Sequence, residues 1–123
     1  MKPRSAPATD AAVATKAVLR AAERLGLSNK TLAKVIGVSE ATVSRMSAGS
    51  YQLARGDKPF ELGLLFVRLF RSLDAIVGGD ETVSMAWMRS ENLALGGTPL
   101  TLIQSIPGLV HVLAYLDARR SLA

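Results

Sequence analysis

The sequence predicts an all-α protein in which an N-terminal helix-turn-helix bundle is joined by a long apolar helix to a small helical C-terminal domain. Apolar residues recur every three or four positions along successive segments, which is the period of one helical face. Ser, Thr or Asp precedes most of these segments and Gly follows most of them, as helix caps do. No segment alternates apolar and polar residues long enough to favour a strand.

The chain divides into three parts by composition. Residues 1–9 contain two prolines and no apolar period, which predicts a flexible tail. Residues 10–58 form the predicted helix-turn-helix domain, and residues 59–123 form the predicted second domain. The first helix begins at a cap on Asp10 and ends at Gly26.

Two short helices follow, each lying between a serine and a glycine. Ser28 is the predicted cap of a helix that ends at Gly37, and Ser39 is the predicted cap of a helix that ends at Gly49. Residues 50–58 are mostly polar and predict a connector.

The next helix, over residues 59–77, is the longest and is apolar around nearly its whole circumference. Pro59 suits its first turn, and Gly78 follows its end. Because a helix that is wet on one side would not look like this, we expect it to pack against both halves of the chain or against a second copy. Asp80 then caps a fifth helix that runs to Arg89, and the stretch "SENLALGG" predicts a turn.

Two more helices complete the chain. Thr98 and Pro99 are a capping hydroxyl and a first-turn proline, which predict the start of a sixth helix. We expect that helix to end at Ile106, because the residue before a proline avoids the helical region. The seventh helix opens at Pro107 and has one apolar face, made of Leu109, Val112, Leu113 and Leu116.

Composition disfavours several classes of protein. The chain has no Cys, which excludes disulfides and thiolate metal sites, and its single histidine, His111, disfavours a zinc site. No catalytic set is recognisable, so we expect no enzyme activity, no cofactor and no metal. The N-terminus has no apolar run of the kind found in signal peptides, and residues 60–77 carry four charges, too many for a membrane span. We therefore expect a cytoplasmic protein.

The positive charge lies almost entirely in the first half. Residues 1–58 carry ten Lys and Arg against four Asp and Glu, a net charge of +6. Residues 59–123 carry five basic against six acidic residues, a net charge of −1. This asymmetry predicts that only the first half binds a polyanion.

Residues 29–48 fit a helix-turn-helix at each constrained position. Ala33 is small enough for two helices to approach closely, and Gly37 suits a turn at positive φ. The apolar residues that would fix the pair to a core are Leu32, Ile36, Val38, Val43 and Met46. The stretch "LAKVIGVSEATVSRM" resembles the Cro/phage-repressor (Xre) helix-turn-helix. The alternative is an ordinary helical hairpin, and the charge of +6 argues against it.

The third helix is then the recognition helix, whose N-terminal part faces the major groove of DNA. Arg45 is suited to bind a guanine through two hydrogen bonds, and Ala41 or Thr42 to contact a thymine methyl. The amides at the start of the second helix favour a phosphate, as do Lys34 and Arg55. The predicted DNA-binding residues are Ser28, Asn29, Lys30, Thr31, Lys34, Ser39, Glu40, Ala41, Thr42, Ser44, Arg45 and Arg55. The sequence leaves open which of them contact bases and which contact phosphates.

A second pattern covers about residues 60–120. It consists of an Asn, a Leu-Gly-Gly turn, Pro-x-x-Leu, a Gly and a Val-x-x-x-Leu core. These positions are Asn92, Leu95, Gly96, Gly97, Pro99, Leu102, Gly108, Val112 and Leu116. The pattern resembles the toxin-binding domain of the Xre/MbcA/ParS antitoxins. Many relatives have a proline soon after the Asn, whereas this chain has "NLALGG", which leaves the course of the loop open.

The resemblance implies a function and partners. Such antitoxins neutralise a RES-domain toxin, which destroys NAD, and they repress their own operon through operator DNA. The apolar helix over residues 59–77 adds the expectation of a homodimer. Two alternatives stay open at this point: a stand-alone Xre-type transcriptional regulator whose C-terminal half only dimerises or senses a ligand, and an enzyme, which the missing catalytic set disfavours.

The last helix offers the clearest predicted contacts with a toxin. A site that consumes NAD must accept a pyrophosphate, so Arg119 or Arg120 is suited to fill it; the alternative is a solvated helix end. Trp87 is either an interface anchor or a core residue, and Gly96 with Gly97 is better explained by a tight turn than by a phosphate loop. The predicted toxin-binding residues are Trp87, Asn92, Leu95, Gly96, Gly97, Tyr115, Arg119, Arg120 and Leu122.

Overall fold

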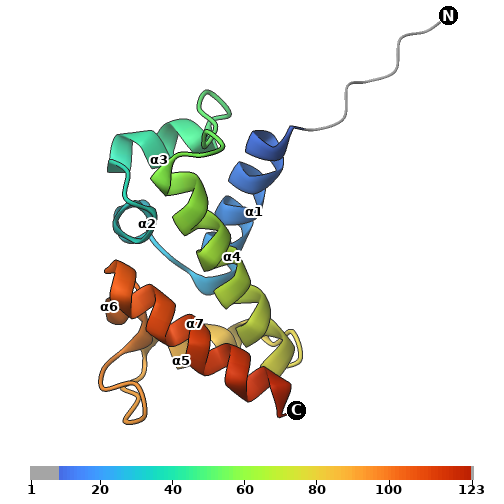
Figure 1. Ribbon diagram of the computed structural model, residues 1–123, viewed down its shortest axis with the longest axis vertical. Helices are drawn as coiled ribbons and strands as arrows, with labels where there is room; N and C mark the ends of the chain where they lie inside the picture. The colour runs from blue at the N-terminus through green and yellow to red at the C-terminus, as the bar shows by residue number, and fades with distance from the viewer. Residues whose placement is uncertain (1–8, 123) are drawn as a thin grey trace, which may run out of the picture.

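The computed structural model describes residues 9–122, which form seven helices and no strand (Figure 1). This confirms the predicted all-α fold class. The predicted tail lies outside the described residues except for Thr9. The helices are α1 (Asp10–Leu25), α2 (Asn29–Ile36), α3 (Glu40–Ser47), α4 (Lys58–Ile76), α5 (Glu81–Arg89), α6 (Pro99–Leu102) and α7 (Ile106–Ser121).

The caps predicted for the first three helices are mostly confirmed. The hydroxyl of Ser28 accepts a hydrogen bond from the amide of Thr31, and the hydroxyl of Ser39 accepts one from the amide of Thr42. The start of α1 differs by one residue. Thr9, not Asp10, is its N-cap, and Asp10 lies in the first turn, where a carboxylate is favourable near the helix dipole.

Helix α4 runs through the middle of the molecule, with α1–α3 around its N-terminal part and α5–α7 around its C-terminal part (Figure 1). It packs mainly on α7 and α1, and also contacts α2. Phe66, Leu69 and Leu73 are almost completely buried in this way. Because these apolar side chains are covered within one chain, they are not available to a second copy. Only Leu64 and Ile76 are large apolar residues of α4 with exposed side chains.

Two arginines connect the two halves. Arg24 of α1 pairs with Asp74 of α4 at 3.5 Å and with Glu81 of α5 at 3.7 Å. Arg89 at the end of α5 donates hydrogen bonds to the carbonyls of Leu25 and Gly26, at 3.0 and 2.7 Å. The end of a helix leaves such carbonyls without intrahelical partners, so Arg89 caps α1 from the other half of the chain.

The sixth helix is shorter than predicted. It ends at Leu102, not at Ile106, and Thr98 makes no side-chain capping hydrogen bond. A turn follows, and α7 then begins at Ile106 because the hydroxyl of Ser105 caps the amide of Gly108. Pro107 lies inside the first turn of α7, where its missing amide hydrogen costs nothing. The predicted apolar face of α7 is confirmed, since Leu109, Val112, Leu113 and Leu116 are all buried.

No helix within residues 9–122 is both long and apolar enough to cross a membrane.

Gly108 allows the α6–α7 turn to close. A Cβ atom at this position would overlap the carbonyl oxygen of Leu102 and lie 2.6 Å from its carbonyl carbon. The opposing atoms belong to the backbone, which cannot rotate away as a side chain does. This gives a physical reason for the glycine at this position of the C-terminal pattern.

We expect Gly108→Ala to lower the free energy of unfolding by about 1–3 kcal/mol, the usual cost of forcing an extra group into a packed site. At an unconstrained helical position the same change would instead stabilise the protein by up to about 1 kcal/mol. Urea unfolding measures the difference, with Ala114→Gly on the exposed side of α7 as the control. A neutral or stabilising Gly108→Ala would show that the turn does not need the glycine.

Candidate functional site

The first candidate site is the exposed side of the α2–α3 pair. Gly37 joins the two helices with a φ of 76°, in the left-handed region that the sequence predicted for it. Ala33 is buried, and its carbonyl accepts hydrogen bonds from the amides of Gly37 and Val38 at 2.9 and 3.0 Å. These contacts fix the tight turn, and they leave the N-terminal part of α3 facing solvent.

Most of the predicted recognition residues lie together on that surface. Those that are exposed are Ser28, Asn29, Lys30, Lys34, Ser39, Glu40, Ala41, Ser44 and Arg45, and Thr31 is half-buried. The side-chain amide nitrogen of Asn29 donates to the hydroxyl of Ser44 at 3.5 Å, which connects the start of α2 with the outer face of α3.

The prediction that Thr42 belongs to the exposed face of the third helix was wrong. Its side chain is buried rather than exposed, because it lies on the same side of α3 as Val43 and Met46. Its hydroxyl is shared between Ser39, at 2.9 Å, and a guanidinium nitrogen of Arg45, at 2.9 Å. Thr42 thus holds the side chain of Arg45 against α3, which is a positioning role that the sequence did not suggest.

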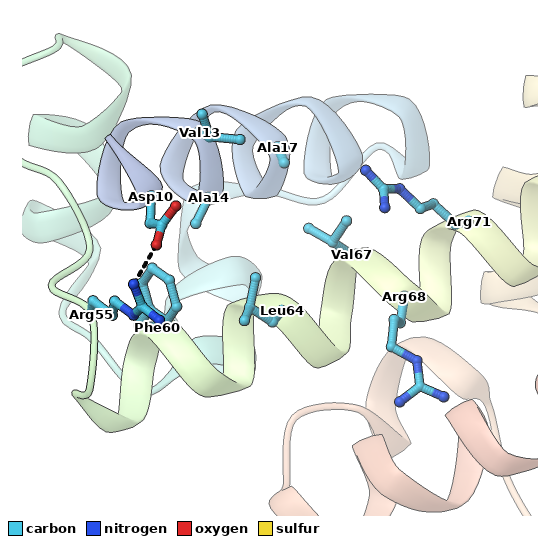
Figure 2. A pocket seen from close by; sticks show the side chains of 10 residues that line it. All are labelled: Asp10, Val13, Ala14, Ala17, Arg55, Phe60, Leu64, Val67, Arg68 and Arg71. Atoms are coloured by element: carbon cyan, nitrogen blue, oxygen red, sulfur yellow. Dashed lines mark hydrogen bonds and ion pairs between the residues drawn. The ribbon is translucent and has the colours of Figure 1, made fainter. Parts of the chain in front are cut away.

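Arg55 lies apart from this surface. Its guanidinium pairs with the carboxylate of Asp10 at 2.6 Å, beside a groove between α1 and α4 (Figure 2). The structure therefore does not bring Arg55 into the α2–α3 cluster, and its contact with phosphate stays a prediction.

The second candidate site begins at the loop over residues 92–97. Asn92 and Gly97 exchange backbone hydrogen bonds of 3.0 and 3.2 Å, and the side chain of Asn92 accepts one from the amide of Leu95. Gly96 takes a φ of 78°, and Leu95 is buried beneath the loop. Asn92, Leu95 and Gly96 therefore shape the loop. The loop presents Leu93 to solvent, and this residue, which is 93% exposed, is not among the toxin-binding residues predicted from the sequence.

Three predicted residues from α5 and α7 form one stack. The rings of Trp87 and Tyr115 lie 6.4 Å apart between centroids and 17° from parallel. The guanidinium of Arg119 lies 5.6 Å from the centroid of the Tyr115 ring, within the range of a cation–π contact. Trp87 is half-buried, so it is both a packing residue and part of an accessible surface. We call these three side chains the aromatic stack.

The two arginines at the end of α7 lie on different sides of the helix. Arg119 lies on the aromatic stack, whereas Arg120 lines a groove with Arg68 and Arg71 of α4. Leu122, at the C-cap of the helix, is 85% exposed. The two arginines that the sequence treated as equivalent thus face different surroundings.

Metal binding receives no support from the side-chain positions. Within the described part of the chain, no three His, Asp or Glu side chains come together in a group that could hold an ion.

These two surfaces on one all-α fold define a helix-turn-helix protein with a second helical binding module. A family model described as the antitoxin Xre-like helix-turn-helix domain matches residues 5–68. A model described as the antitoxin Xre/MbcA/ParS C-terminal toxin-binding domain matches residues 72–121. The chain belongs to the Xre/MbcA/ParS antitoxin family, and it is an antitoxin with a helix-turn-helix domain and a toxin-binding domain.

The comparison of folds agrees with this assignment. A chain in the crystal structure of the M. tuberculosis MbcT–MbcA toxin–antitoxin complex is similar, with a TM-score of 0.66 and 24% identity. The similarity covers 90% of this chain and 96% of that one. At this identity the likeness shows the fold alone. The search of curated proteins found no match to this chain.

The single tryptophan makes the aromatic stack directly observable. We expect Tyr115→Ala to shift the emission maximum of Trp87 to longer wavelength, because removing the stacked ring admits water to the indole. Tyr51→Ala, which changes the only other tyrosine, at an exposed position away from the stack, should leave the emission maximum unchanged. An unchanged spectrum for Tyr115→Ala would mean that the two rings do not stack in solution.

Proposed function

We propose that this antitoxin binds a cognate RES-domain toxin that degrades NAD and blocks its active site, and that it represses its own operon by binding operator DNA as a homodimer. The observation that carries the proposal is the match of one chain to both an antitoxin helix-turn-helix domain and a toxin-binding domain. The identity of the toxin rests on the resemblance to Xre/MbcA/ParS antitoxins. The toxin-binding match favours this function over a stand-alone transcriptional regulator.

Binding to DNA is supported by the chemistry of the α2–α3 surface. Arg45 is exposed and is held by Thr42, so its guanidinium is restricted before it meets a base. Lys30 and Lys34 lie on α2, and Ser28 and Asn29 stand where the free amides of that helix favour a phosphate. We infer that Arg45 contacts a base edge and that the residues of α2 contact the backbone. The sequence-independent part of the affinity then comes from α2.

Inhibition of the toxin is supported by the aromatic stack. Arg119 is an exposed residue, yet its contact with Tyr115 limits the conformations it explores. A restricted cation loses less entropy when it binds an anionic pocket, and charge-assisted hydrogen bonds are the strong ones. We infer that Arg119 enters the part of the toxin site that accepts the pyrophosphate of NAD. Leu93 and Leu122 are exposed apolar residues of the same half of the chain that can add apolar contacts with the toxin.

We expect Arg45→Ala to reduce the affinity for operator DNA by about 1–3 kcal/mol and to relax the preference for operator over random DNA. Gel-shift titration with both DNAs measures the two effects. Arg119→Ala is the matched control, since it removes the same group from the other half of the chain and should leave DNA binding unchanged. Equal operator preference in Arg45→Ala and in the unmodified protein would sink the role of Arg45.

The same two variants exchange roles in a test of toxin inhibition, where Arg119→Ala is the test and Arg45→Ala is the control. We expect Arg119→Ala, and truncation after Asp117, to weaken inhibition of NAD consumption by roughly ten- to a hundred-fold, the equivalent of a lost charged hydrogen bond of about 1.5–3 kcal/mol. Arg45→Ala should inhibit as well as the unmodified antitoxin. The truncation keeps Asp117, so its bonds to Arg68 and Ser72, at 2.6 and 2.7 Å, remain and the fold should persist.

Purified toxin, NAD and each antitoxin variant are sufficient for this assay. If truncation after Asp117 leaves inhibition unchanged, the end of α7 does not block the site, and Leu93 with the 92–97 loop becomes the next surface to vary.

A further inference from the structure

One face of α4, together with its N-cap residue Asp57, is exposed along the whole length of the helix, and of its residues only Arg68 makes an ion pair within the described residues. Its residues follow one another at intervals of four and three, which is the spacing of a seam between paired helices. All are exposed: Asp57, Glu61, Leu64, Arg68, Arg71 and Ala75. We call this face the α4 seam.

The charges of the α4 seam are segregated about its centre. Its N-terminal half carries the acids Asp57 and Glu61, and its C-terminal half carries Arg68 and Arg71. Leu64 stands between them with 45% of its surface exposed. Arg68 already pairs with Asp117 of α7 at 2.6 Å. Within residues 9–122, neither Asp57, Glu61 nor Arg71 has an ion-pair partner.

We propose that the α4 seam is where two copies of this chain pair, antiparallel, about a twofold axis at Leu64. Asp57 and Arg71 each lie seven residues from Leu64, on the same face and in opposite directions. At the rise of an α-helix that places each about 10 Å from the axis. An antiparallel copy therefore sets its Arg71 against Asp57 at one end of the seam, and its Asp57 against Arg71 at the other.

The charge order decides between the two orientations. Parallel pairing about a twofold axis would place Asp57 against Asp57 and Arg71 against Arg71, so that both ends repel. Antiparallel pairing attracts at both ends and joins the two exposed leucines at the centre. A crossing angle of about 20°, usual for antiparallel neighbours in helix bundles, keeps the ends within reach of long side chains. The pattern is thus self-complementary, as a twofold interface must be.

The surface beside the seam is hollowed. Between α1 and α4 lies an open groove of about 530 Å³, whose apolar walls include Val13, Leu64 and Val67 (Figure 2). Val13 is 54% exposed, although it is a large apolar residue. Leu64, Arg68 and Arg71 line this groove as well as belonging to the seam, so a second copy that pairs along the seam also covers the groove. The Asp10–Arg55 pair lies at one end of this groove and Arg71 at the other (Figure 2).

The inference rests on the proposed homodimer and names its surface. The sequence predicted a dimer from the apolar circumference of α4, but those apolar side chains pack within one chain. The charge pattern of the α4 seam is therefore a different reason to expect a dimer. Surface ion pairs are individually weak and are screened by salt. Self-association of the free antitoxin is therefore expected at micromolar or higher concentrations, and weaker when the salt is raised.

Sedimentation velocity of the full chain tests the interface. Leu64→Glu places two carboxylates at the axis, and we expect it to reduce the dimer fraction at least ten-fold. Val83→Glu, at a position on α5 that is 47% exposed, is the matched control and should leave the dimer fraction unchanged. A wild-type chain that stays monomeric at hundreds of micromolar, or two variants that dissociate equally, overturns the proposal.

Charge exchange tests the orientation. Asp57→Arg and Arg71→Asp should each weaken self-association, and the double variant should restore it, because both ends of the seam then attract again. Asp57 makes no side-chain capping bond, so its replacement does not remove one. If the double variant associates no better than either single one, antiparallel pairing is wrong. The DNA and NAD assays are separate measurements, so failure of the dimer and failure of the proposed function remain distinguishable.

Discussion

The close approach of α1 to α4 at Gly63 is the constraint on which the rest of the structure depends. A Cβ atom on Gly63 would lie 2.9 Å from a methyl group of Val18 and 3.3 Å from one of Leu53. Both of those side chains are completely buried, and a packed interior does not absorb an added methyl group without moving its neighbours. Thr15 of α1 adds a hydrogen bond from the amide of Leu53, at 2.9 Å, which fixes the connector to the same contact. Helix α2 packs on α4, and α3 packs on α2, so the close approach of α1 to α4 also determines where the recognition helix α3 lies.

The two candidate surfaces therefore belong to one packed unit rather than to two domains joined by a flexible linker. Helix α4 is shared between the halves, and Arg24 and Arg89 connect them again at the end of α1 (Figure 1). Arg89 meets the negative end of the α1 dipole, where a cation is most favourable. A toxin bound at the end of α7 and a DNA bound along α3 would therefore keep a defined mutual geometry. Simultaneous binding is then governed by steric fit around this unit rather than by a hinge within it.

The sequence predicted what local chemistry decides. Ser28, Ser39 and Asp80 cap helices through amides three residues away, so the signal and its effect lie in the same short segment. The predicted end of α6 was wrong because packing decides where this helix ends. Gly108 leaves room for the carbonyl of Leu102, and the hydroxyl of Ser105 caps the start of α7. The residues on the exposed face of α3 were predicted correctly except for Thr42. No local sequence rule shows that the side chain of Thr42 turns toward the core. The aromatic stack joins residues on two helices, and no single-sequence pattern pairs Trp87 with Tyr115.

The apparent excess of apolar residues in α4 follows from how its circumference is divided. One side meets α1 at Gly63, and another meets α7, where Ser72 donates to Asp117. What remains for solvent is a single row, and there the sequence changes from acidic through Leu64 to basic. The net charge of each half does not show this order, because Asp57 is counted in the first half and Glu61, Arg68 and Arg71 in the second. The order of the charges rather than their sum is what a second copy would recognise, and the buried sides of α4 set the direction in which that row faces.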